Sequence, residues 1–131
     1  MNRRTTPEAD AQRAIVQALR FALPRDAIVH HCANEVTESG SRGQIRQSIL
    51  VGMGVHAGFA DLIVILGGRV LFLEVKSETG RLRKSQEVFR DTVCAQGFGW
   101  ALVRSVDDAL AAVADNGFTS RVRSPARRAA P

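Results

Sequence analysis

The sequence predicts a single α/β domain built on a central mixed β-sheet flanked by helices. Its 131 residues, 45% of them hydrophobic, have the size and composition of one domain around one core. Two apolar runs joined by Gly67-Gly68 predict a buried β-hairpin over residues 61–76. Segments with helical spacing precede and follow this hairpin, an alternation typical of α/β domains.

The first helix is predicted to follow a short arm over residues 1–6. A Thr can cap its first turn, Pro7 stands where its missing N–H costs nothing, and Glu8 faces the positive helix end. Apolar residues then recur at helical spacing until Pro24. A short strand is expected over residues 27–32.

The remaining elements follow from turn residues and periodicity. Residues 34–43 are polar and turn-rich and predict a loop, after which Ile45 and Ile49 predict a short helix ending at Gly52 or Gly54. A helix over residues 83–96 ends at Gly97, followed by a strand over 100–103 and a helix over 106–114. The domain is therefore expected over residues 7–116, with a disordered Arg-rich tail over 117–131.

The hairpin register places three charged side chains together. If Leu66 and Arg69 flank the two-residue turn, Asp61 lies directly opposite Glu74. Opposed residues of antiparallel strands share a face, and so does Lys76, two positions beyond Glu74. The sequence thus predicts two carboxylates and an ammonium at the open end of a buried hairpin.

This pattern has a chemical and a plain interpretation. Two carboxylates that are this close repel each other unless a cation lies between them, and Mg²⁺ uses one or two carboxylates together with water and phosphate. Such an ion activates water, and a neighbouring lysine can position or deprotonate that water or stabilise charge on the phosphate. In the plain interpretation, Asp61 merely begins a strand, and Glu74 with Lys76 is an ordinary surface pair.

Charge indicates which binding partners suit the protein, and cysteine content indicates its cellular compartment. Lys and Arg number 18 against 13 Asp and Glu, a formal charge of +5 that suits DNA, although many soluble proteins are mildly basic. The Arg-rich tail is either a solvated end or a DNA-binding arm. With two cysteines, no membrane-length apolar run and no secretory signal, we expect a cytoplasmic protein without a membrane partner.

Several segments resemble a known family. The segments Gly54-Val-His-Ala-Gly-Phe-Ala-Asp61, Glu74-Val-Lys76 and Gly80-Arg-Leu-Arg-Lys-Ser-Gln86 resemble the VRR-NUC domain, a branch of the PD-(D/E)XK nuclease superfamily. Leu102-Val-Arg-Ser105 is also similar to this family, and the resemblance covers roughly residues 7–114. It implies a restriction-endonuclease-like sheet and a Mg²⁺- or Mn²⁺-dependent DNA endonuclease. It further implies a homodimer that cuts branched DNA, such as four-way junctions, in repair or recombination.

The resemblance also implies roles for individual residues. Asp61 and Glu74 would ligate the metal together with the backbone carbonyl of Val75, and Lys76 would be the catalytic lysine. Gln86 would orient Lys76 or contact the phosphate. Its plain alternative is a helix-surface residue.

The first helix is expected to add one more acidic ligand. The resemblance assigns this role to Glu8, with Asp10 as the other choice. The plain alternative is that Glu8 only complements the positive end of its helix.

Two positions depart from the family pattern. Ala60 stands where the family usually has Pro before the metal-binding Asp, which changes the backbone and not the chemistry. Arg83 stands where the family often has Ser, so a helix cap is lost, Ser85 is the expected substitute, and a cation facing phosphate is gained.

Other candidate sites are weaker. His30, His31 and Cys32 are adjacent on a strand and alternate between its faces, so they cannot converge on zinc, although one histidine is a candidate for contacting phosphate. Gly52, Gly54 and Gly58 only loosely resemble a phosphate-binding loop, because no Gly-Lys-Ser or Gly-Lys-Thr follows.

Two rival functions remain at the level of sequence. The first is a non-catalytic nucleic-acid-binding module that keeps the nuclease fold, and the second is an unrelated basic interaction protein. If the chain is a basic interaction protein, Asp61→Ala should have almost no effect. For the nuclease, the same change abolishes cutting and leaves the fold intact or more stable, because like-charge repulsion is relieved.

Overall fold

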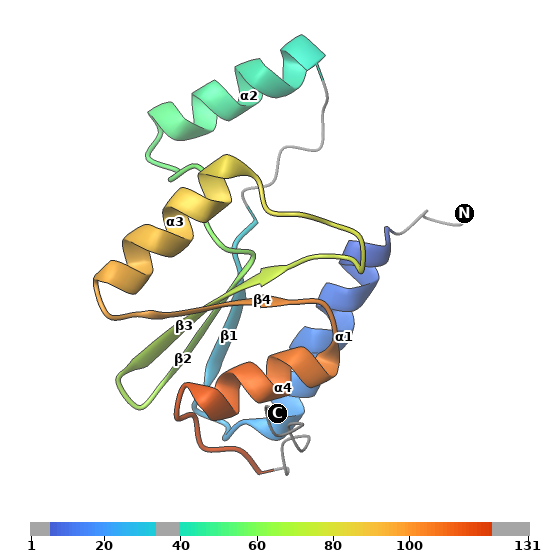
Figure 1. Ribbon diagram of the computed structural model, residues 1–131, viewed down its shortest axis with the longest axis vertical. Helices are drawn as coiled ribbons and strands as arrows, with labels where there is room; N and C mark the ends of the chain where they lie inside the picture. Colours follow the sequence, from blue (N-terminus) through green and yellow to red (C-terminus); the bar gives the residue numbers. More distant parts are fainter. Residues whose placement is uncertain (1–5, 34–39, 122–131) are drawn as a thin grey trace, which may run out of the picture.

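The computed structural model describes residues 6–33 and 40–121, which form a four-stranded mixed sheet with helices on both sides (Figure 1). This confirms the predicted fold class. The elements in chain order are α1 (Pro7–Ala22), β1 (Ile28–His31), α2 (Gly40–Gly52), β2 (Leu62–Leu66), β3 (Arg69–Val75), α3 (Lys84–Ala95), β4 (Gly99–Val103) and α4 (Val106–Asp115).

The sheet has the strand order β1-β2-β3-β4, with β4 parallel to β3 and the other neighbours antiparallel. Gly67 and Gly68 have φ values of 59° and 77°, the left-handed conformation that a tight two-residue hairpin turn requires. Leu66 therefore pairs with Arg69, which confirms the predicted register. The parallel pair needs a crossover, and α3 provides it.

Alternation along the strands gives the sheet two different faces. Leu62, Leu71 and Leu73 are fully buried in a core with α1 and α4. On the opposite face, Phe72 packs against Phe89 of α3. Figure 1 shows α3 on one side of the sheet and α1 with α4 on the other. Both faces are covered over most of the hairpin, as its apolar sequence predicts.

The first helix begins as expected. The Thr6 hydroxyl oxygen accepts a hydrogen bond from the Ala9 N–H at 3.1 Å, and Pro7 is the first helical residue. The chain leaves the helix at Leu23, directly before Pro24. These local signals fix the two ends of α1.

Two predicted boundaries differ from the structure. Residues 40–43, expected in a loop, form the first turn of α2, and residues 34–39 of that segment lie outside the described residues. At the other end, Phe118 is buried in the core, and the Arg121 N–H bonds to the Ala22 carbonyl at 2.6 Å. The folded chain thus continues past residue 116. The rest of the predicted tail, residues 122–131, and residues 1–5 of the predicted arm lie outside the described residues.

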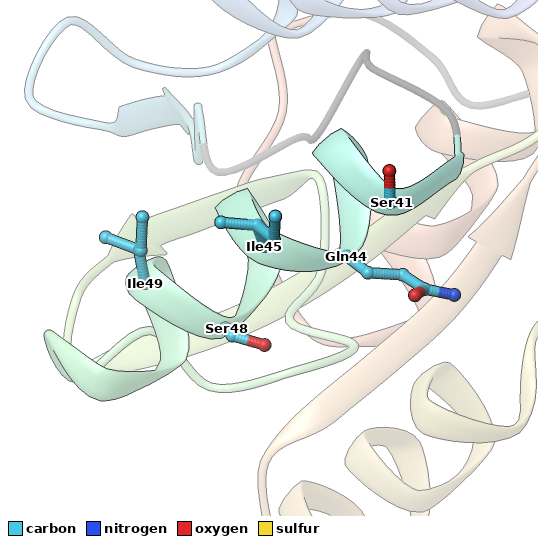
Figure 2. A pocket seen from close by; sticks show the side chains of 5 residues that line it. All are labelled: Ser41, Gln44, Ile45, Ser48 and Ile49. Carbon is cyan, nitrogen blue, oxygen red and sulfur yellow. The ribbon is translucent and has the colours of Figure 1, made fainter.

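The α2 helix stands away from the sheet (Figure 1). A shallow hollow runs along it, and Figure 2 shows Ile45 and Ile49 pointing in the same direction beside it. The residues that line the hollow are Ser41, Gln44, Ile45, Ser48 and Ile49. No helix in the described ranges is long and apolar enough to cross a membrane.

Candidate active site

The predicted site lies where β3 ends on the face covered by α3. Glu74 shares the side of β3 that carries Phe72, and Lys76 follows two residues later. The Lys76 N–H bonds to the Val103 carbonyl at 3.1 Å, so pairing with β4 continues past Val75. Asp61 precedes β2 and belongs to the same end of the sheet.

Asp61 is fixed by its own backbone and side chain. Its carbonyl accepts a hydrogen bond from the Cys32 N–H at 2.8 Å, and its Oδ2 accepts one from the Val75 N–H at 2.9 Å. The second bond joins the strand start to the strand that carries Glu74. The Asp61 side chain thus contacts the backbone of Val75, which directly follows Glu74, in agreement with the predicted register.

Burial separates these three residues from ordinary surface charges. Asp61, Glu74 and Lys76 are 7%, 1% and 6% exposed, and no other polar or charged residue of the described chain is buried to this degree. Charged side chains are almost never buried unless they are paired or serve a function. The plain surface interpretation of Glu74 and Lys76 is therefore wrong.

The electrostatics of Glu74 are unusual for a carboxyl group. Burial first, and then the nearby Asp61 carboxylate, raise the pKa of Glu74 from 4.5 to about 8. The Lys76 ammonium, with Nζ 3.6 Å from Glu74 Oε1, acts in the opposite direction but does not cancel the rise. Without a further cation, the folded protein favours the neutral acid at this position.

Gln86 at the start of α3 holds Glu74. Its side-chain nitrogen donates to Glu74 Oε1 at 2.9 Å, and its side-chain oxygen accepts from the Arg83 N–H at 2.8 Å. Gln86 thus belongs to the site and is not an ordinary surface residue. Its side chain bonds to the Glu74 carboxylate, however, and not to Lys76. Gln86 also caps the helix, the role expected of Ser85, which lies inside the first turn.

A close approach between a loop and α3 fixes Gln86 in turn. Gly58 has a φ of +77°, and a Cβ there would lie 2.1 Å from the Ser85 carbonyl oxygen. The neighbouring Phe59 packs against Phe89 of α3 with ring centroids 4.7 Å apart. Gly58 therefore allows the backbone of this loop to approach α3.

The carboxylate pair fits a hard divalent cation. Glu74 Oε2 is buried and has no hydrogen-bond partner, which is costly for an isolated oxygen and suits a metal ligand. In the part of the chain that the structure describes, no group of three or more His, Cys, Asp or Glu is placed to hold a metal. The structure thus does not bring Glu8 together with Asp61 and Glu74, and its role as a further acidic ligand stays a prediction. The Val75 carbonyl as a ligand stays a prediction.

The other candidates take different positions. His30 pairs with Ile63 and so shares the face of the site, although its contact with phosphate stays a prediction. Burial and the Asp61 carboxylate raise the pKa of Cys32, so its thiol is neutral beside the site. Sequence analysis missed this closeness, which only the pairing of β1 with β2 creates. The α2 hollow contains no ionisable residue and carries none of this chemistry.

Comparison with known proteins addresses the fold. No family model matches the sequence, and no curated protein matches it. A solved structure described as a VRR_NUC domain protein is similar, with a TM-score of 0.64 over 88% of this chain and 91% of that chain. This chain has the VRR-NUC fold. At 17% sequence identity, the similarity concerns the architecture, and function must be argued from the site.

Proposed function

We propose that the protein is a metal-dependent nuclease of the PD-(D/E)XK type that hydrolyses phosphodiester bonds in DNA with Mg²⁺ or Mn²⁺. The observation that carries this proposal is the buried group of Asp61, Glu74 and Lys76, in which one Glu74 oxygen has no partner. The VRR-NUC fold supports it independently of the side-chain geometry.

Each residue has a distinct part in this proposal. Asp61 and Glu74 hold the ion, which when bound polarises the phosphate and makes a water molecule more acidic. Lys76 places a positive charge beside the reacting phosphate and stabilises the negative charge that develops there. Gln86 keeps Glu74 in position through its 2.9 Å hydrogen bond. A buried site gives these charges a stronger effect than they would have in water.

The charge near the site supports DNA as the substrate. Arg81, Arg83 and Lys84 are exposed and lie within five residues of Gln86, which contacts Glu74. Lys and Arg bind phosphates through charge and counterion release, without reading bases. We therefore favour recognition of DNA shape, such as a four-way junction, in repair or recombination. A cytoplasmic homodimer with two sites would suit two-strand cutting.

The test is cleavage of labelled linear, flap and four-way-junction DNA in Mg²⁺, Mn²⁺ or EDTA. We expect metal-dependent cutting by the wild type and a loss of at least about 100-fold in Lys76→Ala. The matched control is Lys84→Ala, which removes the chain's other lysine from an exposed position. That change is expected to alter DNA affinity at most.

The outcomes separate the rival functions. DNA binding without cutting by the wild type, in any of the metals, would favour the non-catalytic nucleic-acid-binding module. Neither binding nor cutting would favour a basic interaction protein. Equal cutting by wild type and Lys76→Ala would remove Lys76 from the mechanism.

A further inference from the structure

We propose that Arg104 is a positioning residue for Lys76, acting through the turn that follows β3. The proposal rests on the proposed nuclease function for its meaning, but its geometry concerns only the chain itself. Arg104 comes directly after β4 and belongs to the Leu102-Val-Arg-Ser105 segment. The turn comprises residues 77–80, directly after Lys76.

A single guanidinium nitrogen of Arg104 holds this turn. Arg104 Nη1 donates to the carbonyl of Ser77, to that of Gly80 at 2.8 Å and to that of Glu78 at 3.2 Å. The Gly80 N–H closes the turn on the Ser77 carbonyl at 3.2 Å. Three carbonyl dipoles that point at one place repel each other, so a cation at this point stabilises the turn.

Arg104 is itself held at the junction of β4 and α4. Its N–H donates to Asp108 Oδ2 at 2.9 Å, and the Ser105 hydroxyl caps α4 by accepting from the Asp108 N–H at 3.1 Å. The guanidinium therefore extends from a fixed backbone position. It connects β4 to a turn 24 to 27 residues earlier in the chain.

The turn lies against the side chain of Lys76. A Cβ placed on Gly80 would lie 3.4 Å from both Cβ and Cδ of Lys76, so the turn passes close beside the lysine stem. The Lys76 side chain is only 7% exposed, and its Nζ lies 3.6 Å from Glu74 Oε1. Releasing the turn would uncover the stem and let the ammonium move away from Glu74.

This arrangement explains why an arginine suits position 104 better than a lysine. An arginine carries several donors in a rigid plane, whereas a lysine offers a compact charge on a flexible chain. Arg104→Lys keeps the charge and should hold the turn partly. Arg104→Ala removes both the charge and the donors.

The test measures the accessibility of Lys76 with an amine-acetylating reagent and mass spectrometry, on the full metal-free chain. Lys84 is exposed and serves as the internal reference in the same molecule. We expect Lys76 to react much more slowly than Lys84 in the wild type. The Lys76-to-Lys84 ratio should rise about tenfold in Arg104→Ala, because local opening exposes the lysine, and less in Arg104→Lys.

The matched control is Arg90→Ala. Arg90 is an α3 arginine that pairs with Asp91 at 2.9 Å, and its loss should leave the labelling ratio unchanged. If Arg104→Ala does not fold, Arg104→Gln is measured in its place, since its amide keeps one donor for the turn. A folded Arg104→Ala protein, or Arg104→Gln in its place, with an unchanged ratio would overturn the proposal.

Kinetics give a second and separate readout. Where the wild type cuts DNA, Arg104→Ala should lower kcat and leave KM nearly unchanged, with partial rescue in Arg104→Lys. A change in KM alone would assign Arg104 to DNA binding and would contradict a positioning role. If the wild type does not cut at all, the proposed function fails, while the labelling experiment still decides whether Arg104 positions Lys76.

Discussion

The end of β3 and the α2 helix differ in almost every physical respect. Glu74 is 1% exposed and held by neighbours from another element, whereas Met53, directly after α2, is 79% exposed. The α2 hollow is lined by uncharged polar and aliphatic side chains, whereas buried charges lie together at the end of β3. Buried, incompletely paired charge therefore marks the end of β3 as the candidate site, and surface shape alone does not.

The contrast has a thermodynamic basis. Burying charged groups costs free energy, and an unpartnered oxygen such as Glu74 Oε2 adds to this cost. The fold tolerates this cost at the end of β3, where Asp61 and Lys76 are buried as well. No comparable cost exists along α2. Substitutions in the two regions should therefore have different consequences, and this can be measured.

The largest expected effect is on activity. Asp61→Asn removes the charge that is proposed to bind the metal and should lower metal-dependent cleavage by at least about 100-fold, measured as single-turnover rates on labelled DNA. The control is Asp26→Asn, a change of the same kind in the exposed turn before β1. Equal losses in the two variants would show that the two regions do not differ in the proposed way.

The choice of Asn matters for stability. Asp61→Ala was expected to leave the fold intact or more stable, but Asp61 Oδ2 accepts a hydrogen bond from the buried Val75 N–H. Ala leaves that donor unpaired, so we expect it to be about 1–2 kcal/mol less stable than Asn in urea denaturation. An Asp61→Ala protein that is as stable as the wild type, or more stable, would restore the original expectation.

The second prediction concerns pH in the metal-free protein. Because the pKa of Glu74 is raised from 4.5 to about 8, the folded chain keeps a proton that the unfolded chain loses within this range. Stability should therefore fall as pH rises from about 4.5 to 8, by an amount on the order of 4 kcal/mol. Asp61 and Lys76 are the charged groups that act on Glu74.

Chemical denaturation at several pH values measures this slope. Glu74→Gln lacks the titrating proton and should flatten it between pH 4.5 and 8. The same slope in Glu74→Gln and in the wild type would assign the effect to another group.

The third prediction tests the contact that fixes Gln86. Gly58→Ala places a Cβ 2.1 Å from the Ser85 carbonyl oxygen at a positive φ, so the loop and α3 must separate. We expect a loss of about 2–3 kcal/mol in unfolding free energy together with reduced cleavage. Gly54→Ala is the control, because its φ is also positive but a Cβ there meets nothing within 4 Å. Similar losses in the two variants would show that the positive φ alone, and not the close contact with Ser85, causes the effect at Gly58.

The smallest effect is expected on α2. Ile49 is 57% exposed, so Ile49→Ala should change stability by less than about 0.5 kcal/mol and leave the cleavage rate unchanged. The matched aliphatic control is Leu71→Ala, a fully buried position where about 2–5 kcal/mol should be lost. A large loss in Ile49→Ala would mean that α2 is packed in solution and would weaken the comparison.

The site was predictable from sequence because a two-residue Gly-Gly turn leaves one register for its strands. That register alone placed Asp61 beside Glu74 and put Lys76 on the same face. The boundaries of the buried elements were also predictable, because periodicity and caps act locally. The first turn of α2 was missed, since a largely exposed helix has no apolar periodicity at its start.

The supporting contacts could not be predicted in the same way. Gln86 and Arg104 act on segments 12 and 24 to 27 residues away, and nothing local in the sequence indicates these partners. Phe118 enters the core from a segment whose composition is typical of a disordered tail. Such contacts depend on how loops and helices dock on the finished sheet.

The central claim is that Asp61 and Glu74 together hold a divalent cation, and calorimetric titration with Mn²⁺ at pH 7 tests it most directly. Because the metal-free protein favours protonated Glu74, Mn²⁺ should bind with release of a proton, seen as a heat that depends on the buffer. Glu74→Gln should bind far more weakly and release none. Tight Mn²⁺ binding by Glu74→Gln, or no binding by the wild type, would contradict the account.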